Sequence, residues 1–109
     1  MAALTVQEIE ATGITPTYAA ADVAGDEFAF SAGAFVHAIN DDASSHTVTV
    51  ASVYPAQPGI APDDIAVTIP AGEERMIGPF NALFFRDSDG NVSLTYDAVT
   101  SVTVAVLTV

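Results

Sequence analysis

The sequence predicts an all-β fold, a β-sandwich of about eight short strands with jelly-roll-like order, or alternatively an immunoglobulin-like sandwich. Three observations predict this fold. Apolar and polar residues alternate in several short runs, as they do in half-buried strands. Gly, Pro, Asn and Asp separate these runs at short intervals. No window shows helically spaced apolar residues behind a capping residue.

The first half of the chain predicts four strands, at residues 4–7, 27–30, 34–40 and 46–53. Residues 34–40 are apolar on both faces, which favours a central position in a sheet. Asn40, Asp41 and Asp42 favour a turn, so we expect 34–40 and 46–53 to form a hairpin. Residues 19–21 are expected to form one short turn that Gly25 prevents from extending.

In the second half, we expect strands at residues 65–69, 74–77, 92–96 and 102–106. The segment 54–64 contains three prolines and a glycine, which predicts a long loop. Residues 70–72 predict a tight turn with 74–77 as the return strand. The form of 80–85 stays open, and Asp89-Gly90 predicts a hairpin. The last segment, 100–109, is β-branched on both faces, which fits either a central strand or a subunit contact.

The length of 109 residues predicts a single domain, 1–109, with residues 1–18 as a possible extended N-terminal arm. The arm is expected because Gly13 and Pro16 interrupt the chain there.

Composition and charge exclude several kinds of partner. Half of the residues are hydrophobic, yet the chain has 14 Asp and Glu, two Arg, no Lys and a net charge of −12. We therefore expect an apolar core under an acidic surface. Nucleic acids and anionic membranes are excluded as partners, because binding either one requires basic side chains. The acidity is also typical of proteins that work at high salt, so a halophilic origin is one hypothesis.

The acidic clusters and the histidines give weak signals for chemistry. Asp87, Asp89 and Asn91 begin like a calcium loop, but the glycine and the closing glutamate are missing, which favours a capping turn. The pairs Asp41-Asp42 and Asp63-Asp64 are expected to be solvated loop charges. His37 and His46 would lie near each other only across the expected hairpin, where a carboxylate could complete a metal site.

No nucleophile, phosphate-binding or zinc-protease motif is present, so the sequence predicts a protein that is not an enzyme and that needs no cofactor.

Six residues are candidates for an interface with another protein. Four belong to segments that the expected core does not explain, and two are the chain's only arginines, in a chain without lysine, which would otherwise pair with Glu73 and Asp87. The candidates are Leu4, Val6, Ile9, Tyr54, Arg75 and Arg86.

The order of several segments resembles small virion proteins of tailed phages and tailed archaeal viruses. These segments are LTVQEIEATGITPTYAAADVAGDEF, FVHAIN, TVTV, VTIPAGEERMIGPF and DGNVSLTYDAVTSVTVAVL. The resemblance covers most of the chain and is most distinctive in VTIPAGEERMIGPF.

The resemblance implies a capsid decoration or cement protein, with a neck, turret or tail role as an alternative. It implies the major capsid protein or another virion protein as partner, a homo-oligomer such as a trimer, and a place in the virion after synthesis in the host cytoplasm. A different alternative is a β-sandwich module that binds carbohydrate or calcium, although the absence of Trp weighs against carbohydrate.

Overall fold

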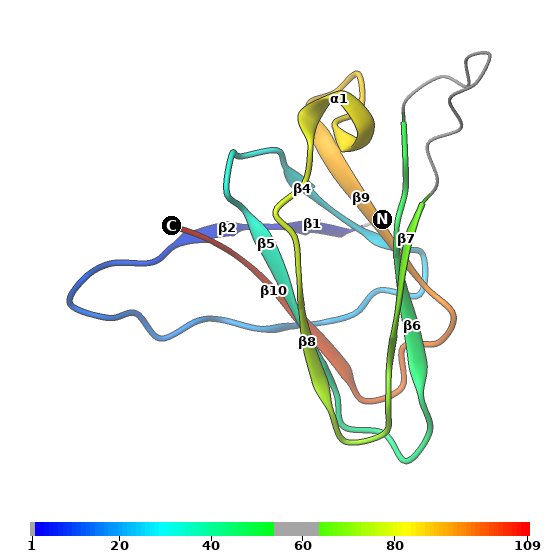
Figure 1. The fold of residues 1–109 in the computed structure, drawn as a ribbon. Coiled ribbons are helices and arrows are strands. Elements are labelled where there is room, and N and C mark those ends of the chain that lie inside the picture. The colour runs from blue at the N-terminus through cyan, green and yellow to red at the C-terminus, as the bar shows by residue number, and fades with distance from the viewer. Residues whose placement is uncertain (1, 54–63) are drawn as a thin grey trace.

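Two β-sheets face each other in the computed structural model, which describes residues 2–53 and 64–109 (Figure 1). The first sheet has the order β1 (Ala2–Leu4), β4 (Asp26–Ala29), β9 (Asn91–Tyr96), β6 (His46–Val50), β7 (Ile65–Ile69). The second has the order β2 (Val6–Glu8), β10 (Val102–Thr108), β5 (Phe35–Asn40), β8 (Glu74–Ile77), and β3 (Ala19–Ala20) also pairs with β10. The predicted all-β sandwich is confirmed.

Strands β3 to β10 have the pairing of a rolled-up hairpin, which is the jelly-roll arrangement. The outermost strands β3 and β10 pair, followed inward by β4 with β9, β5 with β8 and β6 with β7. The bonds between β10 and β5 and between β9 and β6 then join these pairs into two sheets. All six pairings are antiparallel. An immunoglobulin-type sandwich would instead place its first two strands side by side in one sheet.

This topology overturns two local predictions. Segments 34–40 and 46–53 do not form a hairpin, because β5 belongs to the second sheet and β6 to the first. Likewise β8 is not the return partner of β7, although the predicted turn is present and Glu73 N–H donates to Pro70 O at 3.1 Å. A turn sequence specifies that the chain reverses, but it does not specify which sheet receives the next strand.

The core lies between the sheets and follows the predicted alternation. Val48 and Val50 of β6 are 1% and 0% exposed, while Thr47 and Thr49 are half-buried on the other face. Strand β5 lies between β10 and β8, as its two apolar faces predicted. The strand residues of the buried core are Phe28, Val36, Ala38, Val48, Val50, Ile69, Ile77, Val92, Leu94, Val104 and Val106.

The N-terminal segment divides at Thr5 and pairs with both sheets. The expected single strand 4–7 is therefore two short strands. β1 lies parallel to β4 with Leu4 opposite Phe28, and β2 lies parallel to β10 with Val6 opposite Val106. Leu4 and Val6 pack against the core. The segment thus covers one open side of the sandwich.

Three further local predictions need correction or completion. Residues 19–20 form strand β3 rather than a turn, because the edge of β10 offers them backbone partners. Segment 80–85, whose form was open, contains the one-turn helix α1 (Ala82–Phe85). Asn81 caps this helix, its Oδ1 accepting from Leu83 N–H at 2.9 Å. Asp89-Gly90 lies in a turn that joins α1 to β9, so it does not connect two strands.

The connections differ in length between the two ends of the sandwich. At the short-loop end, defined by connections 21–25, 41–45, 70–73 and 97–101, each connection has five residues or fewer. The long-loop end comprises the longer connections 9–18, 78–90 and the described parts of 51–64, together with the five-residue connection 30–34. In Figure 1 three short connections lie at the bottom, whereas loop 9–18 projects to the left. Long connections are where binding surfaces are usually carried.

Candidate functional site

The two histidines lie in separate environments. His37, on β5 of the second sheet, has its Nδ1 hydrogen-bonded to the Tyr18 hydroxyl at 2.7 Å. Its Nε2 lies 3.2 Å from Glu74 Oε1, but the two atoms are not aligned for a hydrogen bond. The side chain is 10% exposed, so Tyr18 fastens the segment before β3 onto a nearly buried ring.

His46 begins β6 in the other sheet and holds two short connections together. Its Nε2 lies 2.8 Å from Asp42 Oδ2, and its Nδ1 lies 3.7 Å from Asp97 Oδ1. The hydrogen bond from His46, assisted by the Ala43 N–H, lowers the pKa of Asp42 below its ordinary value of 3.8. Because β5 and β6 are in different sheets, the hypothesis of a metal site shared by His37 and His46 is wrong.

Across residues 2–53 and 64–109, no three His, Asp or Glu side chains are arranged to hold a metal ion. Asp87 uses its Oδ1 to accept from the backbone N–H groups of Asp89 at 2.9 Å and Asn91 at 2.8 Å. The weak calcium candidates Asp87, Asp89 and Asn91 thus form a backbone-capping turn before β9.

The acidic pairs predicted as loop charges do not converge. Asp42 faces His46 at the short-loop end, while Asp41 donates its N–H to Ser101 O at 2.9 Å. Asp64 lies at the other end and accepts from Ser52 N–H at 2.7 Å. Asp63 lies outside the described residues, as does Tyr54 with the expected loop up to residue 63.

The two arginines differ in their contacts. Arg75 Nη1 lies 3.1 Å from Glu73 Oε1 and donates to the Glu74 carbonyl at 2.7 Å, which is the pairing expected from the sequence. Arg86 makes no ion pair with the carboxylates of the described part of the chain, so the expected pair with Asp87 is not formed. Its guanidinium lies over Gly90, where an added Cβ would be 3.8 Å from Nε and Nη2.

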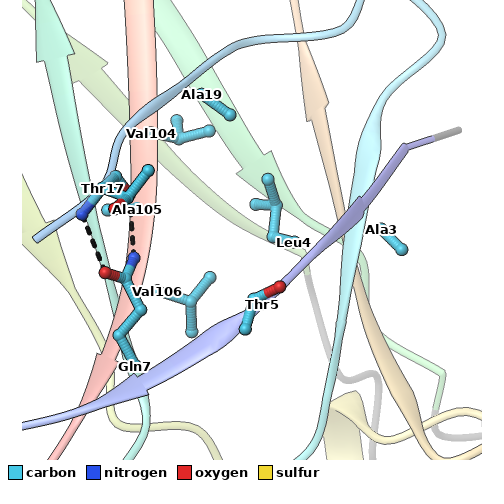
Figure 2. Close-up of a pocket in the computed structure, with 9 residues that line it drawn as sticks. All are labelled: Ala3, Leu4, Thr5, Gln7, Thr17, Ala19, Val104, Ala105 and Val106. Atoms are coloured by element: carbon cyan, nitrogen blue, oxygen red, sulfur yellow. Dashed lines mark hydrogen bonds between the residues drawn. The ribbon is translucent and has the colours of Figure 1, made fainter.

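The N-terminal arm contains the feature that sequence reasoning missed. The Gln7 side-chain amide bonds the Thr17 backbone twice, from Nε2 to Thr17 O and from Thr17 N to Oε1, both at 2.8 Å (Figure 2). Gln7 thus makes the two hydrogen bonds to Thr17 that a neighbouring strand would make. These bonds join the two ends of loop 9–17, which we call its neck. Surface loops whose two ends lie close together are frequently functional.

A groove of about 370 Å³ lies beside this neck, between the arm and the segment before β3. Figure 2 shows Gln7 and Thr17 bridging one end of the groove, with Leu4 and Thr5 on the arm and strand β10 opposite. The lining residues are Ala3, Leu4, Thr5, Gln7, Thr17, Ala19, Val104, Ala105 and Val106. The lining contains no ionisable side chain, so its chemistry suits an apolar or neutral occupant.

Helix α1 provides an apolar corner at the long-loop end. Leu83 is 61% exposed, and Val53, whose N–H donates to Phe84 O at 2.7 Å, is 37% exposed. In the same helix, Phe85 packs edge-on against Phe80, with ring centroids 5.9 Å apart. Leu83 and Val53 together make up the apolar corner at this end.

The interface candidates of the arm lie on the domain itself. Leu4 and Val6 are half-buried on the core, and Ile9 is 39% exposed with its N–H donated to Thr108 O at 2.7 Å. Within the single chain the arm completes the domain's own sheets, and the alternative of pairing with a neighbouring subunit stays a prediction. An interface role for Ile9 and for the two arginines stays a prediction.

A buried carboxyl was also missed from the sequence. Asp26 is 0% exposed, and its Oδ2 accepts from the Tyr96 hydroxyl at 2.6 Å and from Asp22 N–H at 3.2 Å. Burial and this bond to Asp26 raise the pKa of Tyr96. The signal was available, because alternation puts Asp26 on the same face as Phe28.

Comparison of the chain with family models, with curated proteins and with solved structures gave no match in any of the three. Among the described residues, no helix has the length and apolar character needed to cross a membrane.

Proposed function

We propose that this chain is a non-enzymatic structural protein of a virus particle, a decoration or cement protein that binds the assembled capsid shell. The observation that carries the proposal is that four of the six large hydrophobic side chains exposed in the described residues, Ile9, Val53, Leu83 and Val109, lie at the long-loop end. Loop 9–18 also projects from the sandwich, on a different side from helix α1 (Figure 1).

The chemistry of the surface supports binding rather than catalysis. Several ionisable groups of the described residues are engaged in structural contacts: Asp87 caps a turn, His46 joins two connections, and Asp26 accepts a hydrogen bond from Tyr96. The apolar corner and the loop offer contact area instead. The sequence resemblance to small virion proteins favours a capsid as the surface that they contact.

A cement protein acts through linkage. A protein that binds the closed shell more tightly than free subunits stabilises the shell in proportion to its occupancy. Several copies around a symmetry axis strengthen weak individual contacts through avidity, which is why a homo-oligomer, for example a trimer, is part of the proposal. The acidic remainder of the surface stays in solvent and opposes aggregation.

The test is to add the purified protein to capsids that lack it and to image them by electron microscopy. Saturable density repeated over the shell supports decoration. Density confined to one vertex or to the tail would transfer the role to the neck, turret or tail. Absence of binding to any part of the particle would reject the virion proposal.

Matched variants identify the contact surface. Leu83→Ser removes the most exposed side chain of the corner, and Ile9→Ser removes an apolar side chain of the arm. Thr68→Ser, on the exposed face of β7, serves as the control. We expect weaker capsid binding for the first two variants and wild-type binding for the control, whereas equal binding by all three would exclude the long-loop end as the contact.

A halophilic host is a separate part of the proposal. With a net charge of −12, screening should relieve repulsion within the chain. The melting temperature should therefore rise between low salt and several molar NaCl, and a constant or falling value would remove this part.

A further inference from the structure

We propose that residues 2–8, the strand-forming part of the N-terminal arm, exchange between copies of this chain, so that β1 and β2 of one copy pair with β4 and β10 of another. The place beside β4 and β10 is then filled by the same segment of a second copy. This inference does not depend on capsid binding.

The contacts that hold the arm can be made equally well between two copies. In the described part of the chain, β1 pairs only with β4 and β2 only with β10, in parallel registers that join the arm to strands far along the chain. Leu4 and Val6 pack on the core of whichever copy provides those strands. An exchanged arm reproduces each of these contacts, so exchange costs little enthalpy.

The connection behind the arm has the properties of a hinge. Residues 9–13 are exposed, and in residues 14–17 only Ile14 and Pro16 are half-buried. The loop folds back through a turn at Gly13, whose N–H donates to Glu10 O at 2.9 Å and whose φ is 90°. Straightening the loop therefore exposes little apolar surface.

The reach of the hinge is sufficient. The connection 9–18 between β2 and β3 has ten residues, which span roughly 33 Å when extended. The domain measures 41 × 35 × 21 Å, so an extended connection is comparable to the width of a neighbouring copy.

Packing and charge set when exchange occurs. The groove of about 370 Å³ beside the arm leaves one flank of it unpacked, and the two Gln7–Thr17 bonds close the neck. Two copies that each carry −12 repel at low salt. Exchange should therefore increase with salt, as the screening length falls from about 10 Å at 0.1 M to about 3 Å at 1 M.

The absence of native cysteine permits a direct test. Ala3 lies opposite Glu27 in the register of β1 and β4, at a spacing that a disulfide can bridge. We would mix an Ala3→Cys variant with a Glu27→Cys variant of different mass in several molar NaCl, oxidise, and measure the covalent heterodimer. The control mixture is Ala3→Cys with Thr68→Cys, since Thr68 lies on β7 at the opposite edge of that sheet.

The proposal expects about ten-fold more heterodimer in the first mixture than in the control. Equal yields would overturn it, because random collisions then account for all cross-links. The yield should also fall at low salt.

Two loop variants separate the hinge from the neck. Gly13→Ala strains the folded-back turn without a steric clash, since nothing lies within 4 Å of the added Cβ, so the exchanged fraction should rise about five-fold relative to Thr12→Ala. Gln7→Ala should speed exchange but leave its final extent unchanged, because the same two bonds re-form between copies. An unchanged fraction with Gly13→Ala, or a changed final extent with Gln7→Ala, would contradict this mechanism.

Discussion

The short-loop and long-loop ends of the same sandwich are held by different interactions. At the short-loop end, buried polar groups tie each connection to its neighbours: Asn40 is 0% exposed and its Nδ2 donates to Ser44 O at 2.9 Å and Ile69 O at 3.0 Å. His46 joins Asp42 and Asp97 in the same region. At the long-loop end, loop 9–17 is closed mainly by the exposed Gln7–Thr17 pair.

The difference shows how one fold can place its stabilising interactions at one end and its proposed contact surface at the other. Buried hydrogen bonds are costly to leave unmade, so the short-loop end cannot rearrange locally. Exposed bonds can be replaced by water, so the arm and its loop can change partner without unfolding the domain. Substitutions at the two ends should therefore differ in their effect on stability.

The largest effect is expected for Asn40→Ala. The substitution leaves the carbonyls of Ser44 and Ile69 and the N–H of Asp42 without their partner inside the protein. We expect the free energy of unfolding to fall by about 3 kcal/mol, measured by urea denaturation. A fall no greater than that of Gln7→Ala would remove the distinction between the ends.

A smaller loss is expected for Tyr96→Phe, also near the short-loop end. It removes the 2.6 Å hydrogen bond to the buried Asp26 carboxyl, whose Oδ1 already has no partner among the described residues. We expect a loss of about 2 kcal/mol in the same assay. Tyr18→Phe is the control, because its partner His37 is 7% exposed whereas Asp26 is 0% exposed, and its loss should be the smaller of the two.

Gln7→Ala should cost less than about 1 kcal/mol, because both bonds to Thr17 are exposed and water replaces them. Amide hydrogen exchange at residues 9–17 should accelerate in this variant, while exchange in β5 and β10 should not change. Acceleration throughout the domain would mean that the arm is part of the global folding unit.

The smallest effect is expected for the contribution of Asp42 to the pH dependence of stability. Because its pKa is lowered in the folded protein, its contribution to stability is present above its unfolded value of 3.8 and is lost as the pH falls through the folded value. Compared with wild type, Asp42→Asn should therefore lose less stability in urea titrations between about pH 5 and pH 2.5. His46→Gln should behave like Asp42→Asn, and a wild-type slope in both variants would contradict the assigned cause.

The strands themselves were largely predictable from local pattern. Local pattern located seven strands, in segments 27–30, 34–40, 46–53, 65–69, 74–77, 92–96 and 102–106. Most were found by alternation, because a strand with one buried face needs a period of two, whereas 34–40 was found by its apolar residues on both faces and 74–77 by the turn before it. The pattern failed at residues 19–20, where two alanines carry no alternation and the edge of β10 provides the pairing.

The candidate site was less predictable. Exposed apolar residues such as Leu83 follow from no periodicity, since a four-residue helix is too short to show one. Gln7 looked like an ordinary polar strand residue, and its partner Thr17 lies ten positions away without a motif to mark it. Arm residues such as Leu4 and Val6 were found because their apolar character needed burial, but the pattern did not say in which sheet.

By itself the sequence determined a β-rich chain with an apolar interior, an acidic surface and turns at defined places, because these depend on composition and on neighbours along the chain. Only the tertiary structure decided which strands share a sheet, that β5 and β6 separate, and that Asp26 and Asn40 become buried. These outcomes depend on contacts between distant segments, and the free energy of a turn is the same whether the next strand joins one sheet or the other.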